Sequence, residues 1–258
     1  MRFCSLGSGS TGNAAVVEAG GGDGTRVLID CGFTLKELAL RLARADVAPE
    51  AIDAIFVTHE HGDHIGCAFA LARRHRIALW TSRGTWRAAG EPALDAGLLH
   101  FARDGEPIAV GALELRPYTV PHDAAEPLQL VCGDGARRLG VLTDAGSVTP
   151  HATAALAGCE ALLLECNHDR AMLAASAYPA SLKARVSGRF GHLANDAAAE
   201  VLAACRHERL RHVVAAHLSL QNNRRELASG ALAAVLGTRP DDIVVATHDE
   251  GFGWLDLR

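Results

Sequence analysis

The stretch THEHGDHIG, residues 58–66, concentrates titratable side chains directly after the largely apolar run 52–57. Three histidines, a glutamate and an aspartate fall within six consecutive positions. In an extended segment, residues two apart point to the same side, so His59 and His61 can bind one metal ion together. Imidazole and carboxylate ligands suit zinc above all, and also manganese or iron.

The second half of this stretch offers ligands for a second ion. Gly62 permits a turn, after which the side chains of Asp63 and His64 can face a different point. One ion hardly needs four ligands from so short a loop, so the pattern favours two divalent ions, with Asp63 as both a ligand and a catalytic residue. A plain strand-to-helix turn capped by Asp63 is the alternative, but ligands at this spacing behind an apolar strand rarely arise by chance.

Three more polar residues stand where apolar strands end: His122 follows LRPYTVP, Asp144 follows LGVLT and His217 follows HVVAA. Sites of α/β proteins lie at such strand ends. Taken singly each would more often be a loop residue, but together with the histidine cluster all three are better explained as ligands. Other histidines in polar or helical surroundings are predicted to lie at the surface: His75, His100, His151, His207 and His212.

The elements that must position these residues alternate between strands and helices, which predicts a layered α/β domain. A glycine-rich turn is expected at 20–24, and Thr34 is expected to cap a helix that runs to about residue 45. Strands are expected at 2–6, 14–18, 26–30, 51–58, 77–81, 112–117, 129–132, 138–143, 161–165, 212–216 and 243–246. Further helices are expected at 65–75, 181–187, 196–205 and 225–236.

Composition bounds the class of protein. The 258 residues are 49% hydrophobic and 21% charged, which is ordinary globular composition. No linker or low-complexity segment divides the chain, so one domain over residues 1–258 is expected. Seven scattered cysteines predict reduced thiols in the cytoplasm, and no signal peptide or membrane span is expected. The net charge of −5 disfavours an overall basic nucleic-acid binder.

In order along the chain, Asp30 in VLIDCG, the THEHGDH stretch, His122, Asp144 and His217 resemble the five ordered motifs of the metallo-β-lactamase superfamily. The resemblance implies an αββα sandwich of two mixed β-sheets, with the site along one edge. Asp30 would hydrogen-bond to the ligand loop and position it. The implied ligands are His59, His61 and His122 for one ion and Asp63, His64 and His217 for the other, with Asp144 bridging both.

The resemblance also narrows the branch of the superfamily. True β-lactamases usually carry a cysteine where this chain has Asp144, whereas an aspartate is typical of phosphodiesterase, lactonase and glyoxalase branches. Two ions about 4 Å apart suit phosphodiester cleavage, because they share a hydroxide nucleophile and neutralise charge on the phosphorane. Five stretches resemble the YycJ/WalJ group, which implies a DNA exonuclease acting from 5′ ends: LGSGSTGN, VPHDAAEP, ECNHD, GHLAND and AHLSLQNN.

Two further histidines are candidate catalytic residues. GHLAND also resembles the RNase Z and PhnP phosphodiesterases, which place an added histidine at the position of His192. His192 is therefore predicted to bind phosphate or to act as a general acid toward the leaving oxygen; a solvated helix-entry histidine is the alternative. His168 either lines the site or caps a helix.

Small polar residues near the motifs are candidate substrate contacts. Ser8, Ser10 and Asn13 lie in a glycine-rich turn that either cradles phosphate or simply joins two strands.

The stretch after His217 supplies a second group of candidate contacts. Asn222 and Asn223 are predicted to contact phosphate or sugar, and Arg224 with Arg225 to hold a nucleic-acid backbone. Asn223 could also cap the helix that begins near Arg225.

The combined prediction is a two-metal hydrolase that acts on DNA or another phosphodiester. A small cyclic or nucleotide phosphodiester is a rival substrate, because the chain is acidic and carries no insertion for nucleic acid. Hydrolysis of a thioester or lactone is a rival reaction. A non-enzymatic metal scaffold is disfavoured, because such a site would be closed by its ligands.

Overall fold

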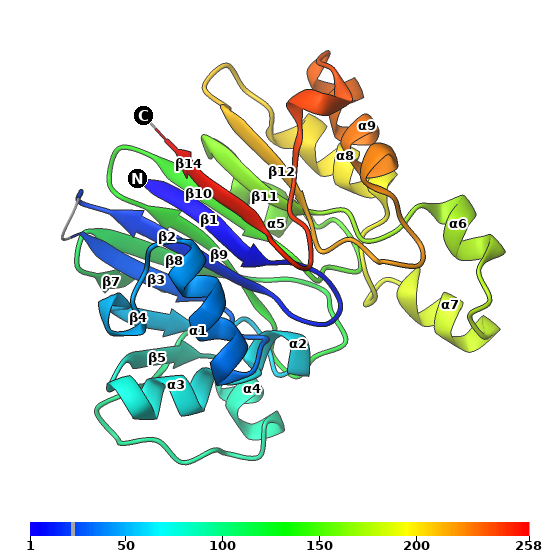
Figure 1. Cartoon of the computed structure of the whole chain (residues 1–258). Helices are drawn as coiled ribbons and strands as arrows, with labels where there is room; N and C mark the ends of the chain where they lie inside the picture. Colours follow the sequence, from blue (N-terminus) through cyan, green and yellow to red (C-terminus); the bar gives the residue numbers. More distant parts are fainter. Residues whose placement is uncertain (22–23, 258) are drawn as a thin grey trace.

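The architecture is a sandwich of two β-sheets with helices on the outer faces, as seen in a computed structural model that describes residues 1–21 and 24–257 (Figure 1). The predicted αββα sandwich with two mixed sheets is confirmed. Part of the glycine-rich turn expected at 20–24, residues 22 and 23, lies outside the described residues.

The first sheet is mixed. Its seven strands lie in the order β14-β1-β2-β3-β4-β5-β6. β1 pairs antiparallel with β14 and β2, whereas β3 to β6 run parallel. The strands are β1 (Arg2–Gly7), β2 (Ala14–Ala19), β3 (Thr25–Ile29), β4 (Ala54–Phe56), β5 (Ala78–Thr81), β6 (Leu99–Phe101) and β14 (Phe252–Asp256).

The second sheet is also mixed, in the order β13-β12-β11-β10-β9-β8-β7. β7 to β10 pair antiparallel, and β10 to β13 run parallel. The strands are β7 (Ile108–Val110), β8 (Leu113–Thr119), β9 (Leu128–Gly133), β10 (Arg138–Leu142), β11 (Ala161–Glu165), β12 (His212–Ala216) and β13 (Val244–Val245).

Helices cover both outer faces, and α6 and α7 stand at one edge, outside the sheets (Figure 1). Thr34 caps the first helix as predicted, because its side chain accepts a hydrogen bond from the backbone of Glu37. No helix among the described residues is long and apolar enough to span a membrane. The helices are α1 (Leu35–Arg44), α2 (Gly62–Ile65), α3 (Ala68–His75), α4 (Arg83–Ala88), α5 (Pro150–Leu156), α6 (Arg170–Ala175), α7 (Ala180–Val186), α8 (Asn195–Cys205) and α9 (Arg225–Leu236), with 3₁₀ turns η1 (Pro49–Ala51) and η2 (Pro240–Asp242).

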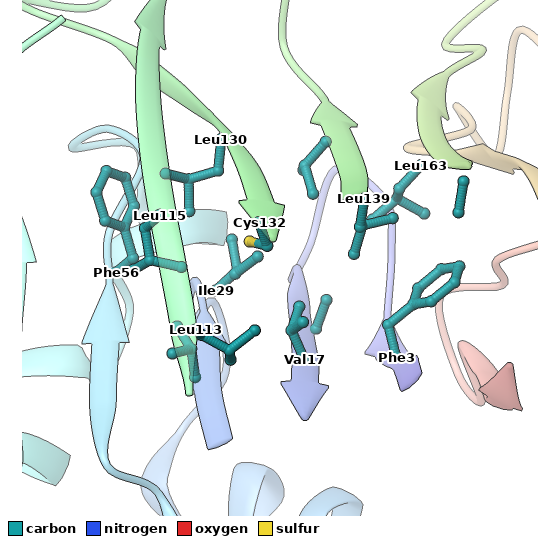
Figure 2. Close-up of a cluster of buried hydrophobic side chains, with 14 of the residues drawn as sticks. Phe3, Val17, Ile29, Phe56, Leu113, Leu115, Leu130, Cys132, Leu139 and Leu163 are labelled. Carbon is teal, nitrogen blue, oxygen red and sulfur yellow. The ribbon is translucent and has the colours of Figure 1, made fainter. Parts of the chain in front are cut away.

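Strands such as β3 and β11 are buried on both faces because each sheet packs against the other sheet and against helices. In β3, Val27 and Ile29 point into the core between the sheets, whereas Leu28 packs on the other face with Leu38 and Leu42 of α1. Figure 2 shows the core between the sheets, where side chains from the two sheets point toward one another.

Two predicted elements differ from the structure around the histidine cluster. The strand expected at 51–58 is only Ala54–Phe56, because η1 precedes it and the ligand loop begins after it. The helix expected at 65–75 is split into α2 and α3. Gly66 separates them at φ 28°, and a Cβ there would lie 2.3 Å from the carbonyl oxygen of Cys31.

Candidate metal centre

The candidate ligands gather at one end of the sandwich because neighbouring parallel strands end there. Asp30 directly follows β3, Asp144 lies two residues beyond β10, and His217 directly follows β12. These three residues have left-handed backbone, with φ of 61°, 53° and 55°. Left-handed backbone costs non-glycine residues free energy, so its recurrence here is typical of a functional site.

The first set of ligand atoms consists of the imidazoles of His59, His61 and His122. Nδ1 of His61 lies 3.1 Å from Nε2 of His59 and 3.3 Å from Nε2 of His122. Nδ1 of His122 lies 3.0 Å from the carbonyl oxygen of Gly191 and donates a hydrogen bond to it. In the neutral ring, Nε2 of His122 therefore keeps a lone pair that can bind a metal ion. Burial lowers the pKa of both His59 and His122, which keeps them neutral. Three converging imidazole nitrogens suit a cation.

The second set consists of Asp63, His64 and His217. Oδ2 of Asp63 lies 3.5 Å from Nε2 of His64 and 3.5 Å from Nε2 of His217. His64 and His217 are buried, and Asp63 is partly exposed. The arrangement offers one oxygen and two nitrogens around a common point.

Asp144 lies between the two sets. Its carboxylate is 2.8 Å from Nε2 of His64, 3.4 Å from Nε2 of His217 and 4.0 Å from Nε2 of His122. Among the described residues, two buried polar atoms here lack a partner in hydrogen-bond geometry: Nε2 of His217, and Oδ2 of Asp144 despite its 2.8 Å contact with Nε2 of His64. Because buried polar atoms are nearly always paired, these orphaned atoms fit a bound metal ion.

The electrostatics of the second set also favour a cation. Burial by itself would lower the pKa of His64 and His217, but nearby carboxylates outweigh it. Asp144 and Asp30 hold the pKa of His64 well above its ordinary value, and Asp144, Asp63 and Glu165 raise the pKa of His217 to about 9. The metal-free site therefore attracts positive charge and holds protons where an ion would bind.

Metal binding is therefore expected to release protons at pH 7. A group whose pKa is raised above the solution pH keeps its proton, and a histidine must lose that proton before it can bind metal. Titration calorimetry of zinc, presented as a weak chelate to the stripped protein, should show release of about one proton or more at pH 7 in buffers of different ionisation enthalpy. Release should fall at pH 9.5, above the pKa of His217. Equal release at both pH values would contradict this.

Asp30 holds the ligand loop in place. Its carboxylate accepts hydrogen bonds from the backbone and side chain of Thr58, at 2.8 and 3.0 Å, and lies 2.7 Å from Nδ1 of His64. The bond to Nδ1 leaves Nε2 of His64 free to face Asp144. The structure thus places Asp30 where the resemblance implied.

The turn that contains Ser8, Ser10 and Asn13 contacts the candidate ligands through two of these three side chains. Oγ of Ser8 accepts a hydrogen bond from the backbone of His217 at 2.8 Å, and the amide of Asn13 contacts Asp63 and His64. Both side chains are buried, whereas Ser10 is exposed. Of the three candidates for phosphate contact, Ser8 and Asn13 thus use their side chains in hydrogen bonds to other parts of the protein.

His192 lies beside both sets. Its Nδ1 is 2.8 Å from Oε1 of Glu165 and 3.2 Å from Oδ1 of Asp144, and its side chain is 23% exposed. Burial opposes protonation, but the two carboxylates raise the pKa of His192 well above its ordinary value. The imidazole is therefore fixed at Nδ1, protonated, and still accessible.

Glu165 is the functional residue that the sequence reasoning missed. It is fully buried, contacts His192, lies 3.4 Å from Nδ1 of His217, and accepts a hydrogen bond from the backbone of Ala145. Its signal was present, since Glu165 ends the apolar strand ALLLE in the same way that Asp144 follows LGVLT.

The remaining candidates are His168 and the residues that follow His217. His168 is buried and, among the described residues, neither ring nitrogen has a partner; the cap of α6 is Asp169, so His168 does not cap that helix. Asn223 is buried and pairs with Asn195. Asn223 is not the N-cap of α9, because Arg224 occupies that position without a side-chain cap.

The last predictions concern the exposure of the residues after His217 and of five other histidines. Asn222 is buried, whereas Arg224 and Arg225 are exposed. Among the histidines predicted to lie at the surface, only His151 is exposed, and His75, His100, His207 and His212 are partly buried because each contacts a neighbouring group.

The chain is similar in sequence and in fold to several known proteins. The family described as "Beta-lactamase superfamily domain" matches residues 25–217. A Bacillus anthracis protein named exodeoxyribonuclease YycJ is 34% identical over 92% of this chain and 89% of its own length. A Streptococcus pneumoniae protein named exodeoxyribonuclease WalJ is 31% identical over 88% of this chain and 85% of its own. The fold is similar to that of YhfI from Bacillus subtilis, with a TM-score of 0.74, 14% identity and 98% of each chain covered.

Proposed function

The chain belongs to the metallo-β-lactamase superfamily of hydrolytic enzymes, and from this premise we propose that it is a two-metal phosphodiesterase that removes nucleotides from 5′ ends of DNA. The observation that carries the proposal is the pair of ligand sets on either side of Asp144, with a carboxylate-bound histidine beside them. Two relatives that match most of the chain bear the name exodeoxyribonuclease, which supports the DNA substrate. The polarity rests on the motif resemblance alone.

The residues present fit two divalent ions. His59, His61 and His122 would hold one, and Asp63, His64 and His217 the other, with Asp144 shared. Bound there, the ions would supply Lewis-acid stabilisation of the phosphoryl oxygens and a lowered pKa for the attacking water. Zinc suits this set of nitrogen and oxygen ligands best.

The chain's own residues would orient the ligands and move a proton. Asp30 and Gly191 fix the rings of His64 and His122 through their Nδ1 atoms. Glu165 holds Nδ1 of His192 and keeps the ring protonated, so its Nε2 proton is available to the leaving oxygen. Donation to that oxygen as the P–O bond breaks avoids an unstable alkoxide.

The exposed arginines after His217 support an extended substrate. Arg224 and Arg225 are both exposed at the start of α9, and no ion pair joins either side chain within the described part of the chain. Cationic side chains next to a hydrolytic site are suited to phosphates beyond the one that is cleaved. A local basic group of this kind is compatible with a net charge of −5.

We extend the proposal to the chain as a whole: residues 1–258 form one domain in a reducing compartment. A single apolar core joins residues of both sheets, such as Val17 of β2 and Leu139 of β10. All seven cysteines are unpaired and buried, which is typical of cytoplasmic proteins.

A panel of substrates tests the proposed activity. The metal-loaded protein is expected to shorten 5′-phosphorylated duplex or single-stranded DNA from the 5′ end and to cleave bis-p-nitrophenyl phosphate. It should leave a β-lactam essentially untouched, because Asp144 stands where true β-lactamases usually carry cysteine. A thioester, the substrate of the rival reaction, should also be left essentially untouched if the enzyme is a phosphodiesterase. Gel analysis of 3′-labelled oligonucleotides measures the polarity.

Other outcomes of this panel point to other functions. Cleavage of small phosphodiesters without any degradation of DNA would favour a small-molecule phosphodiesterase, for which the acidic net charge argues. Efficient thioester hydrolysis with inert phosphodiesters would move the protein to a glyoxalase-like function.

A further inference from the structure

Phe190 is an aromatic side chain that the fold leaves in solvent. Among the aromatic residues in the described part of the chain it alone is exposed, at 49%. It lies in the segment between α7 and α8, two residues before His192. Since consecutive Cα atoms are 3.8 Å apart, the Cα atoms of Phe190 and His192 lie within about 7 Å of each other. The backbone of Phe190 is therefore close to that of His192, which lies beside the candidate metal centre.

The backbone around Phe190 is held against the loops that carry the ligands. The backbone of Asp123 donates to the carbonyl oxygen of Phe190 at 2.9 Å, next to the ligand His122. On the other side, Oγ of Ser147 donates to the carbonyl oxygen of Arg189 at 3.1 Å, three residues after Asp144. Hydrogen bonds on both sides therefore fix the backbone that carries the exposed ring.

The backbone around Phe190 also packs closely against Gly146, in the loop after Asp144. A Cβ at Gly146 would lie 2.4 Å from the backbone nitrogen of Gly191 and 2.5 Å from the carbonyl oxygen of Arg189. Only glycine leaves room for the segment to approach the loop after Asp144. The position of Phe190 is therefore coupled to both ligand loops.

A positive charge accompanies the ring. The guanidinium of Arg189 lies 5.0 Å from the centre of the Phe190 ring. Arg185, on the last turn of α7, forms an ion pair with Asp123 at 2.6 Å and neutralises the carboxylate of the residue whose backbone contacts Phe190. An aromatic face beside an arginine is the combination that binds single-stranded nucleic acid, through base stacking and phosphate attraction.

We propose that Phe190 and Arg189 form a stacking platform for the nucleobase of the nucleotide at the cleaved end. This inference rests on the proposed nuclease function and adds a subsite to it. The base stacks on the exposed face of Phe190, and Arg189 attracts the adjoining phosphate. The terminal nucleotide is thereby unstacked from the DNA and its phosphodiester is directed to the site beside His192. Because every base has an aromatic face, the platform binds the end with little sequence preference.

An oligonucleotide whose terminal nucleotide is abasic separates stacking from other effects. For the metal-loaded enzyme, Phe190→Ala is expected to lower the ratio of kcat/KM on the normal end to that on the abasic end by about 5- to 150-fold, which corresponds to ~1–3 kcal/mol per stacked base. Phe190→Trp should restore the ratio. Leu40→Ala, which removes an exposed apolar side chain from α1, should leave it unchanged.

A binding measurement supplies a second readout. With 2-aminopurine as the terminal base of a cleavage-resistant phosphorothioate oligonucleotide, release of that base from the stack of its DNA neighbour should raise the fluorescence on binding, and Phe190→Ala should reduce this rise. An equal loss on normal and abasic ends, with the rise in fluorescence retained, would overturn the platform. A wild-type enzyme that cleaves bis-p-nitrophenyl phosphate but no oligonucleotide also overturns it while sparing the phosphodiesterase, and one that cleaves neither refutes the proposed function itself.

Discussion

Asp144→Asn is expected to lower phosphodiester hydrolysis on the order of 10³-fold or more and to reduce bound metal below two ions per chain. Asp144 is the carboxylate between the two ligand sets, 4.0 Å from Nε2 of His122 in the first and 2.8 Å from Nε2 of His64 in the second. Asparagine keeps the size of the side chain but replaces a negative oxygen with an amide that binds cations poorly. Elemental analysis and the rate on bis-p-nitrophenyl phosphate measure the two effects.

A matched substitution controls for the general effect of losing an aspartate. Asp95 is exposed and pairs with Arg76 at 3.2 Å, so Asp95→Asn should keep both metal and activity. If Asp144→Asn retained two ions and the wild-type rate, a shared carboxylate would not be part of the mechanism.

His192→Ala is expected to keep both metal ions and to lower kcat on DNA by about 10²- to 10⁴-fold. The other candidate ligands remain in place, whereas the proton donor held by Glu165 is lost. A p-nitrophenolate leaving group needs little protonation, so bis-p-nitrophenyl phosphate should be affected much less than DNA. Steady-state rates on the two substrates at saturation, together with elemental analysis, test this.

His151 offers a comparable pair outside the site. It lies 2.7 Å from Oδ1 of Asp104 at the surface, so His151→Ala removes a carboxylate-bound histidine without touching the ligands. A His192→Ala enzyme that loses metal would show that His192 is itself a ligand, which its position near Asp144 makes a definite rival role. Unchanged turnover of DNA would leave His192 as a helix-entry histidine.

The residues that gather at the candidate metal centre could be identified from sequence because their signals are local. His59 and His61 are two apart in extended chain, and Asp144 and His217 each follow an apolar strand, so period and strand ends suffice. The alternation of strands and helices predicted a layered α/β domain, and the resemblance to the metallo-β-lactamase superfamily implied the sandwich of two sheets.

The contacts that position the ligands could not be read in this way. The bond from His122 to Gly191 joins residues 69 apart, and that from His217 to Ser8 joins residues 209 apart. Such contacts depend on how loops from different sheets meet, which no local pattern encodes. For the same reason Ser8 and Asn13 resembled phosphate contacts in sequence, although in the structure they hold the backbone of His217 and the side chain of Asp63.

The order of the ligands along the chain has a consequence for biosynthesis. His59 to His64 belong to the loop after β4, whereas His217 lies beyond β12, and β12 must first pair with β11. At ~5–20 residues per second, a ribosome needs on the order of 10 s to travel from the first ligands to the last. During that interval the nascent chain exposes an incomplete set of imidazoles. The proposed second ion could therefore be held only after translation has passed β12, so the complete pair of ions would form in a nearly finished protein, and metal supply would act on its maturation.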